Sequence, residues 1–592
     1  MKPADNRPSD LEGRESAWLQ RHGPAAVFVL ALAIRMAYWF ESRRSPLFDV
    51  FVLDADVYVR TARAILAGDW LAGQEVFSMS PLYPYILALF HALTGGSMPA
   101  VKAIQHVIGA ATCALICRAG IRIAGPAAGM AGGLISAVYG IFIYSEGTLE
   151  NEFLVLFLNT LALRLLLEVD RPDSVRIACL AGVAVGLSTD LRPNAALLTV
   201  PAVLWILRPS TGGRRPVLCA LSFGAAVLLA VLPISVRNYA VSGEWIWTTA
   251  SGGQLLYIGT LKDGGGGYSV PPFVAARPES EHRDFRRMAE QNLGRRISAG
   301  ESSRYWARQA AREIAADPAG QMKLVAKKAL AFWNADEPPD NSDYRYGRRL
   351  SRVLSLPLAG IGVVLPLAAI GFFLAVVSGR RWFLPLGFLL VYFISVLLFY
   401  QSYRFRLPAV PSLLMMAGAS VVWLSHRLLD RSYRRFLAGI TVMALAAWVA
   451  HLPLPQARPD QDALTMAGNY AEALRQQGRL NAAAGLLESA ARQYRPDAET
   501  LRQLADLRRD LGQWSGAVEL YRRVADDPNI GRGAHANLAY CALQMRDMDA
   551  ARSHAARAID LDPQDTFARF ILKVTDESGR RRRRRHLGRR GR

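Results

Sequence analysis

Long hydrophobic runs separated by short polar connections cover most of this chain up to about residue 453. The runs are roughly 17–24 residues long, and ~20 apolar helical residues cross the ~30 Å hydrocarbon core of a bilayer. The first run, Pro24 to Phe40, lacks a small-residue cleavage site and is expected to be an uncleaved span. The pattern predicts a polytopic α-helical membrane protein. Eleven spans are predicted, at roughly 24–40, 99–119, 126–144, 150–168, 176–190, 193–208, 216–235, 354–377, 382–400, 407–426 and 436–453.

Basic residues in the short connections predict the orientation of these spans. With a cytoplasmic amino terminus, they fall mainly on the inner side, as the positive-inside rule requires. Two long segments, roughly 41–98 and 236–353, then lie outside, and the amphipathic stretch Val57 to Ala67 is expected along the interface. Arg192-Pro193 interrupts two short spans, and a count that differs by two gives the same sidedness. The inner arginines are Arg118, Arg122, Arg171, Arg176, Arg208, Arg214, Arg215, Arg380, Arg381, Arg427, Arg431, Arg434 and Arg435.

Beyond the last span, the sequence becomes polar and helical and repeats with a period of 34 residues. Small residues recur where paired helices would touch, which is typical of tetratricopeptide repeats. About three repeats are predicted at 463–570, after a linker at 454–462. Such arrays commonly bind a protein partner, and a folded spacer is the alternative. The recurring residues are Ala471, Ala505 and Ala539; Ala483, Ala517 and Ala551; Leu480, Trp514 and Met548; and Gly478 and Gly512.

The net charge of +21 does not indicate a nucleic-acid partner, because of where the charge lies. Nine arginines fall within the last thirteen residues, and an Arg-rich disordered tail is predicted at 571–592. Many other basic residues lie in the short loops that orient the spans. The five cysteines form no paired framework, so neither a disulfide scaffold nor a cysteine metal site is expected.

Carboxylates gather at the predicted outer ends of the spans. Asp54 and Asp56, followed by Tyr58, come directly after the first span. Residues two apart in a helix point about 200° away from each other, so only one of the two aspartates is expected to face a shared site. The alternative role for either is capping of the interfacial helix. A second group, Glu146, Glu150 and Glu152, lies at the outer junction of two spans, where simple solvation is the alternative.

Arginines at the same level are the candidate cations. An arginine at membrane depth is costly unless it is paired or lines a wet cavity. Arg35 lies in the outer half of the first span, where an ion pair at the level of Asp54 is as good an interpretation as ligand binding. Guanidinium forks suit a lipid phosphate, and snorkelling to headgroups is the alternative. The remaining candidates are Arg192, Arg237, and Arg404 and Arg406 beside Tyr403.

Together these groups match what the transfer of a sugar from a lipid carrier requires. A carboxylate must take the proton of the acceptor as it attacks the anomeric carbon. Cations must hold the departing phosphate, and an apolar groove must receive the prenyl tail. The outer ends of the spans contain residues of all three kinds.

In their order along the chain, these motifs resemble those of the GT-C membrane glycosyltransferases, in particular the protein O-mannosyltransferases and lipid A aminoarabinose transferases. The resemblance covers roughly residues 24–426. The motifs are Asp54-x-x-x-Tyr58, Gly68-Asp69-Trp70, Ser80-Pro81-Leu82, Leu191-Arg192-Pro193, Arg237-Asn238, the stretch Lys328 to Pro339, and Arg404-Phe405-Arg406-Leu407-Pro408.

This resemblance implies an inverting transferase that uses a polyprenyl-phosphate-linked sugar, with no nucleotide sugar in its active site. By position, Asp54 matches the catalytic aspartate of the first outer loop, and Glu150 or Glu152 matches a second acidic residue. Two positions depart from the pattern. Ala55 stands where the family often has glutamate, and Ser80 stands where the aminoarabinose enzymes have lysine, so shared substrates are not implied.

The expected fold is therefore an all-α polytopic membrane protein, GT-C-like, with a large extracytoplasmic loop and a C-terminal tetratricopeptide solenoid. A cytoplasmic segment at 1–23 precedes the transmembrane domain at 24–453. The protein is expected in the plasma or inner membrane, with the catalytic loops and the repeats extracytoplasmic. The partners are the lipid-linked donor, membrane lipids, and a glycan, lipid or protein acceptor. The sequence requires no cofactor, although a divalent metal is compatible with it. An O-antigen-ligase-like enzyme and a transporter of lipid-linked sugar are the alternatives.

Overall fold

The structure is a computed structural model that describes residues 10–208, 215–269, 271–274, 278, 280–454, 459–527 and 530–577. The run Arg580 to Arg585 and the rest of the chain after residue 577 lie outside the described residues, as do 1–9, Arg214 and residues 455–458 of the predicted linker. The chain divides into two compact units. The membrane unit comprises 1–49, 53–269 and 289–457, and the repeat unit comprises 50–52, 270–288 and 458–592.

Long apolar helices form the body of the membrane unit. Seven stretches among the described residues are long and apolar enough to cross a membrane: Glu15–Ser42, Met98–Ala124, Ser174–Leu191, Pro216–Ser242, Ile361–Leu398, Tyr403–Leu429 and Tyr433–Ala450. They contain α1 (Asp10–Ser42), α4 (Met98–Ala124), α8 (Ser174–Leu191), α10 (Pro216–Ser242), α17 (Ile361–Ser378), α18 (Phe383–Leu398), α20 (Val410–Leu429) and α21 (Tyr433–Ala450).

The other predicted spans fall on shorter helices. Their helices are α5 (Pro126–Ala137), α6 (Gly140–Glu146), α7 (Glu152–Leu166), η1 (Pro193–Leu198) and α9 (Thr199–Leu207). The stretch Ile361–Leu398 holds two predicted spans, joined by η2 (Gly379–Trp382). The polytopic helical fold is therefore confirmed, and the count of eleven spans stays a prediction.

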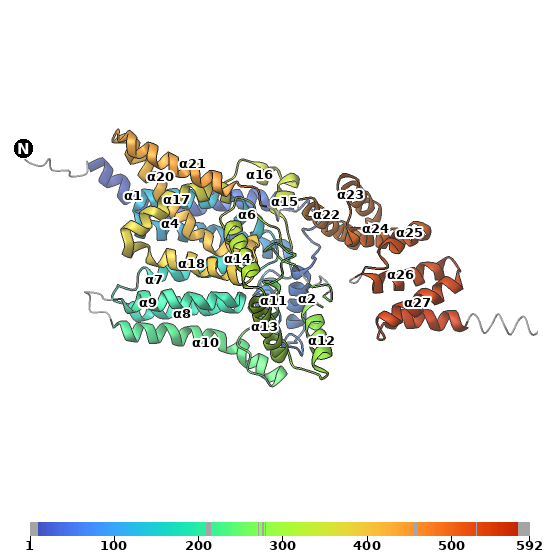
Figure 1. Ribbon diagram of the computed structural model, residues 1–592. Coiled ribbons are helices and arrows are strands. Elements are labelled where there is room, and N and C mark those ends of the chain that lie inside the picture. The colour runs from blue at the N-terminus through green and yellow to red at the C-terminus, as the bar shows by residue number, and fades with distance from the viewer. Residues whose placement is uncertain are drawn as a thin grey trace, which may run out of the picture. The chain divides into compact units, whose positions relative to one another are not determined.

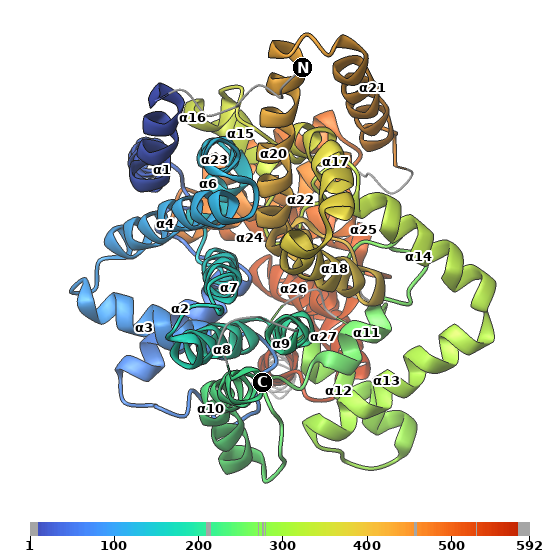
Figure 2. The same ribbon diagram turned by 90° about the vertical axis from the view of Figure 1, so that its left-hand side faces the viewer.

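Shorter helices gather at one end of the long ones, away from the start of α1 (Figure 1). Seen end on, α3 and α14 project beyond the long helices on two sides (Figure 2). The predicted amphipathic stretch from Val57 forms part of α2. The apolar face of this helix is buried. The described helices of the two long outer segments are α2 (Asp54–Leu66), α3 (Leu82–Leu93), α11 (Gly252–Ile258), α12 (Glu281–Leu293), α13 (Ala299–Ala316), α14 (Pro318–Phe332), α15 (Tyr344–Leu350) and α16 (Arg352–Ser355).

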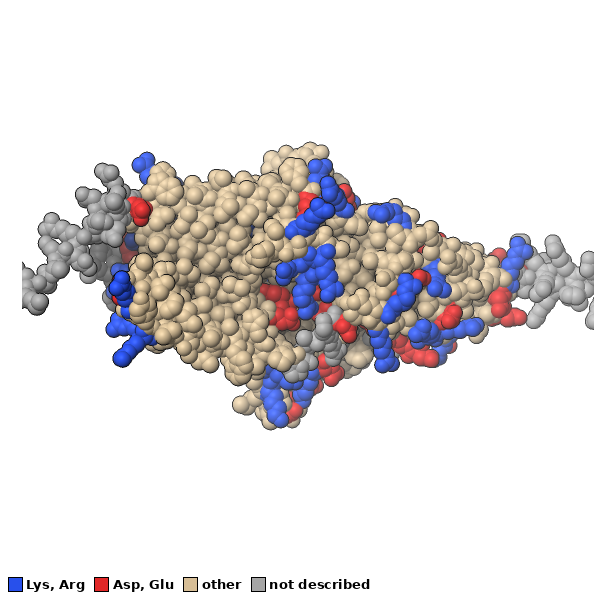
Figure 3. Space-filling view, turned by 90° about the horizontal axis from the view of Figure 1, so that it is seen from above, with Lys and Arg blue, Asp and Glu red and all other residues tan. Residues whose placement is uncertain are grey.

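Charged side chains are unevenly distributed over the membrane unit. A broad face over the long helices carries no Lys, Arg, Asp or Glu, and basic side chains stand at its end near the start of α1 (Figure 3). Glycines let these helices approach closely: a Cβ at Gly371 of α17 would lie 2.1 Å from the carbonyl oxygen of Met416 in α20. Such small-residue contacts replace the hydrophobic effect as the packing force between helices in lipid.

Residues 459–561 of the repeat unit form helix pairs with the predicted period. The pairs are α22 (Pro459–Gln476) with α23 (Leu480–Gln493), α24 (Ala498–Asp510) with α25 (Trp514–Val524), and α26 (Gly531–Gln544) with α27 (Met548–Leu561). The second helices begin at Leu480, Trp514 and Met548, each 34 residues after the last. A further helical run at 566–577 reaches into the predicted tail, and α22 begins within the predicted linker.

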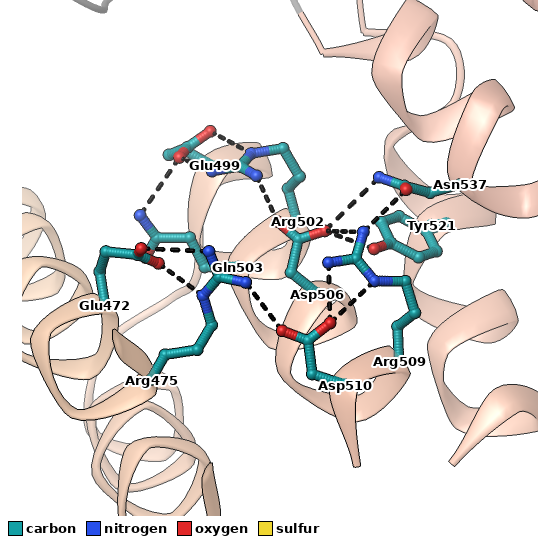
Figure 4. Close-up of polar contacts among 10 residues, drawn as sticks. All are labelled: Glu472, Arg475, Glu499, Arg502, Gln503, Asp506, Arg509, Asp510, Tyr521 and Asn537. Carbon is teal, nitrogen blue, oxygen red and sulfur yellow. Dashed lines mark hydrogen bonds and ion pairs between the residues drawn. The ribbon is translucent and has the colours of Figure 1, made fainter. Parts of the chain in front are cut away.

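Polar contacts along the first helices lie both within a repeat and between successive repeats (Figure 4). Asp506 of α24 accepts hydrogen bonds from Arg502, at 2.5 Å, and from Tyr521 of α25. Arg475 of α22 donates to Asp510 of α24 at 2.7 Å. The contact between Arg475 and Asp510 supplements the apolar packing between the first two repeats.

Candidate active site

Arg404 lies at the centre of the acidic cluster in the membrane unit. It belongs to α19 (Tyr403–Arg406), a single turn that precedes η3 (Leu407–Ala409) and α20. Its Nε lies 2.6 Å from Glu152 Oε1 and 3.7 Å from Glu150 Oε2. Its Nη1 lies 3.1 Å from Asp54 Oδ2 and 3.7 Å from Asp340 Oδ1. One buried guanidinium thus contacts carboxylates from three segments that are far apart in sequence.

Glu152 is the first residue of α7, and Glu150 lies two residues before it. Arg192 donates to Glu152 at 2.8 Å and to the carbonyl of Arg404 at 2.6 Å. The Oε2 atoms of both glutamates are buried and accept no hydrogen bond from the described residues. The hydrogen-bonding capacity of both glutamates is therefore not fully used within the cluster.

Asp54 and Asp56 have different surroundings, as their spacing predicts. Asp54 contacts Arg404 and is 15% exposed, which makes it the most exposed carboxylate of the cluster. Asp56 is 38% exposed and pairs with Arg60 at 3.0 Å, one turn further along α2. Tyr58 is buried against Tyr83, with ring centroids 4.9 Å apart. Burial, and secondarily the charge of Asp54, raises the pKa of the Tyr58 hydroxyl, so that hydroxyl stays protonated.

Arg35 pairs with Glu146 rather than with Asp54. Its Nε lies 2.7 Å from Glu146 Oε2, and His106 Nδ1 lies 3.2 Å from the same oxygen. Gln105 fixes the following turn by donating to the carbonyls of Glu146 and Thr148, at 2.8 and 2.7 Å. This buried network supports the segment that leads into Glu150 and Glu152.

Two of the arginines predicted to bind phosphate instead donate hydrogen bonds to backbone carbonyls. Arg237 donates to Leu71 and Glu75 of the first outer loop, each at 2.7 Å, and its guanidinium lies 4.0 Å from the ring centroid of Phe77. Arg406 donates to the carbonyls of Phe332, Asn334 and Asp336 and pairs with Glu337 at 2.5 Å. Both side chains hold loops in place. Tyr403, also a candidate, forms a hydrogen bond between its hydroxyl and Ser342 at 2.8 Å.

The sequence analysis missed Asp340 and Asn341. Asn341 Nδ2 donates to Glu150 Oε1 at 3.1 Å, beside the contact of Asp340 with Arg404. Burial raises the pKa of Asp340, and the charge of Arg404 opposes that shift. The pair directly follows the motif stretch that ends at Pro339, and two polar residues after two prolines in an outer loop were the available signal.

No metal-binding arrangement accompanies this cluster. Within the described ranges, no group of three or more His, Cys, Asp or Glu side chains is placed to hold a metal ion.

Comparison with known proteins gives one family match. The family described as dolichyl-phosphate-mannose-protein mannosyltransferase matches residues 78–238, from the first outer loop to α10. This match confirms the resemblance to membrane glycosyltransferases that the motifs predicted. A search of the curated protein sequences gives no match.

Two solved structures show weaker likeness. The oligosaccharyltransferase AglB from Archaeoglobus fulgidus, in complex with an inhibitory peptide and a dolichol-phosphate, is 12% identical with a TM-score of 0.40, covering 76% of this chain and 58% of its own. ArnT from Cupriavidus metallidurans, bound to undecaprenyl phosphate, is 14% identical with a TM-score of 0.30, covering 69% and 79%. The chain thus spans less than two thirds of the length of AglB.

Proposed function

We propose that the protein transfers a sugar from a polyprenyl-phosphate carrier to an acceptor on the outer face of the membrane, with inversion at the anomeric carbon. The observation that carries the proposal is the convergence of Asp54, Glu150, Glu152 and Asp340 on Arg404. The family match over 78–238 supports the reaction class, since its description names a lipid-phosphate-linked sugar donor.

Asp54 is the proposed base, because it is the most accessible carboxylate of the cluster. It takes the proton of the attacking group while the new bond forms at the anomeric carbon. The bond from that carbon to the phosphate oxygen breaks, and the electron pair leaves with the polyprenyl phosphate. The attack comes from the face opposite the phosphate, which inverts the configuration.

Arg404 is the proposed phosphate ligand, because a guanidinium fork suits the negative charge that grows as the bond breaks. Arg192 acts through Glu152, which it holds against Arg404. Arg35, Arg237 and Arg406 take supporting roles, because their contacts are to Glu146, to loop carbonyls and to Glu337. Tyr58 and Tyr403 are buried, and the charges of Glu150, Glu152 and Arg404 act on both hydroxyl groups.

In the proposed topology, the protein lies in the plasma or inner membrane. Its amino terminus is in the cytoplasm. The basic end near the start of α1 supports it, since positive charge stays on the cytoplasmic side. The catalytic loops and the repeats are then extracytoplasmic, where the repeats can recruit a protein partner.

The test is transfer by the purified protein in lipid, with labelled polyprenyl-phosphate sugars and a cell-envelope extract as acceptor. Asp54→Asn should lower transfer by about 100-fold or more, since it removes the general base. Asp56→Asn is the matched control, because this exposed carboxylate lies two residues away and contacts Arg60 instead. Equal transfer by both variants would contradict the role of Asp54. Movement of intact lipid-linked sugar across the bilayer, without consumption of carrier, would support a transporter instead.

A further inference from the structure

The segment between α14 and α15 is fastened to the turn that carries Arg404. Arg406 holds the carbonyls of Asn334 and Asp336, at 2.6 and 2.8 Å. The backbone N–H of Tyr403 donates to the carbonyl of Pro338 at 3.1 Å, and the Tyr403 hydroxyl contacts Ser342 at 2.8 Å. A long loop thus has a defined conformation on both sides of Asp340.

This fastening brings Asp340 and Asn341 into the acidic cluster. Asn341 donates to Glu150 at 3.1 Å. Asp340 Oδ1 and Asp54 Oδ2 both face the same nitrogen atom, Arg404 Nη1, at 3.7 and 3.1 Å. The proposed base therefore has a second carboxylate beside it, contributed by a different outer segment.

Arg404 holds Asp340 less closely than it holds Glu152, at 3.7 Å compared with 2.6 Å. Its 3.7 Å contact with Arg404 is longer than a hydrogen bond, whereas Glu152 lies within 2.8 Å of two guanidinium groups. Its side chain is 12% exposed, compared with 1% for Glu152. A carboxylate that is partly accessible and lies beyond hydrogen-bond distance of its guanidinium partner can exchange that contact for one with a substrate.

Resting on the proposed transferase reaction, we propose that Asp340 binds the acceptor. It accepts a hydrogen bond from a donor group adjacent to the attacking atom, while Asp54 takes the proton from the attacking atom itself. Asp340 keeps its own charge throughout and forms no covalent bond. Its contribution is to hold the attacking atom in line with the anomeric carbon, as proximity and orientation require.

The donor can react with the acceptor or with water, and comparing these two reactions distinguishes acceptor binding from donor binding. Transfer to the envelope extract needs the acceptor to be bound, whereas release of free sugar to water needs only the donor and the base. Asp340→Asn should lower transfer about tenfold or more at limiting acceptor, since a hydrogen bond to a charged group is lost. The loss should appear as a raised KM for the extract, with donor hydrolysis within about twofold of wild type.

Asp336→Asn is the matched control, because Asp336 lies in the same segment and its side chain pairs with Arg345 at 3.1 Å. It should leave both reactions unchanged. Asp340→Glu should restore part of the transfer, because it restores the charge. Equal losses of transfer and hydrolysis in Asp340→Asn would assign Asp340 to the donor and overturn the proposal.

Failure to fold is checked by thermal unfolding of each variant. If Asp340→Asn and Asp340→Ser both unfold far below wild type, Asp340 is a structural residue and the proposal is overturned. If wild-type protein neither transfers nor hydrolyses any donor, the proposed function itself fails. If wild type is active and Asp340→Asn matches it, only the acceptor role fails.

Discussion

Asp54 and Asp56 stand two residues apart at the start of α2, yet only Asp54 contacts Arg404, at 3.1 Å. Asp56 turns to solvent and pairs with Arg60 at 3.0 Å. The helical period separates the two side chains, so one faces the cluster and the other does not. This relationship assigns the first aspartate to the site without any reference to family resemblance.

Arg404→Lys should abolish most activity even though it keeps the charge. Arg404 contacts Glu152 through Nε and Asp54 through Nη1, and the single nitrogen of lysine cannot reproduce that fork. Transfer should fall by about 100-fold or more, which is the scale for loss of an oriented donor in an active site. Arg60→Lys, on the exposed face of α2, is the control and should behave as wild type. Transfer by Arg404→Lys within a few fold of wild type would mean that any cation at this place suffices.

Glu146→Gln should destabilise the membrane unit. Arg35 and His106 both contact Glu146, and all three side chains are buried. Removing the carboxylate charge leaves an uncompensated buried guanidinium, which costs about 3–5 kcal/mol. The thermal unfolding midpoint in lipid measures the loss.

The double variant Arg35→Met with Glu146→Gln is the control for this pair. It should unfold at a higher temperature than Glu146→Gln alone, because no unpaired charge remains. An equal or lower midpoint for the double variant would show that the pair is not the source of the loss.

The sequence predicted the parts of this fold that depend on local pattern. Apolar runs located the long helices, and the 34-residue period located the starts of α23, α25 and α27. Both signals arise from one helix face or one repeat, so neighbouring residues are enough to reveal them.

The sequence could not distinguish the occupied arginines from the available ones. Arg404 and Arg406 are two residues apart and look alike, yet Arg406 is surrounded by carbonyls of residues about 70 positions earlier in the chain. Asp340 was missed for the same reason, since its partner Arg404 lies in a different segment. Such roles depend on tertiary contacts that no local pattern encodes.

His535 and His554 make the repeat unit sensitive to acid. Their Nδ1 atoms lie 3.1 Å apart, between α26 and α27. Burial lowers the pKa of both imidazoles below the ordinary value of 6.5, and for His554 the neighbouring His535 adds to the shift. The unfolded state therefore binds more protons than the folded one, so stability rises with pH through this window and is lost as the pH falls below about 6.5.

Hydrogen exchange of α26 and α27 in the intact protein measures this effect. After correction for intrinsic exchange rates, their protection should be lower at pH 5.5 than at pH 7.5, by an amount that His535→Gln reduces. Equal protection at the two pH values in wild type would contradict the prediction.

Arg546→Gly should stabilise the third repeat. Gly478 and Gly512 end the first helices of the first two repeats, each with a φ of 73°, and Arg546 occupies the same place 34 residues later with a φ of 63°. A residue with a Cβ is strained in this left-handed region, whereas glycine adopts it freely. The gain should be about 0.5–1 kcal/mol after the larger chain entropy of glycine is subtracted, read as increased amide protection in α26 and α27 of the intact protein.

Arg546→Ala is the matched control, because it removes the charge and keeps the strain, so it should give no gain. Gly512→Ala should lose about 1 kcal/mol in the second repeat by the same argument. Equal protection in Arg546→Gly and Arg546→Ala would show that the backbone at this position is not strained.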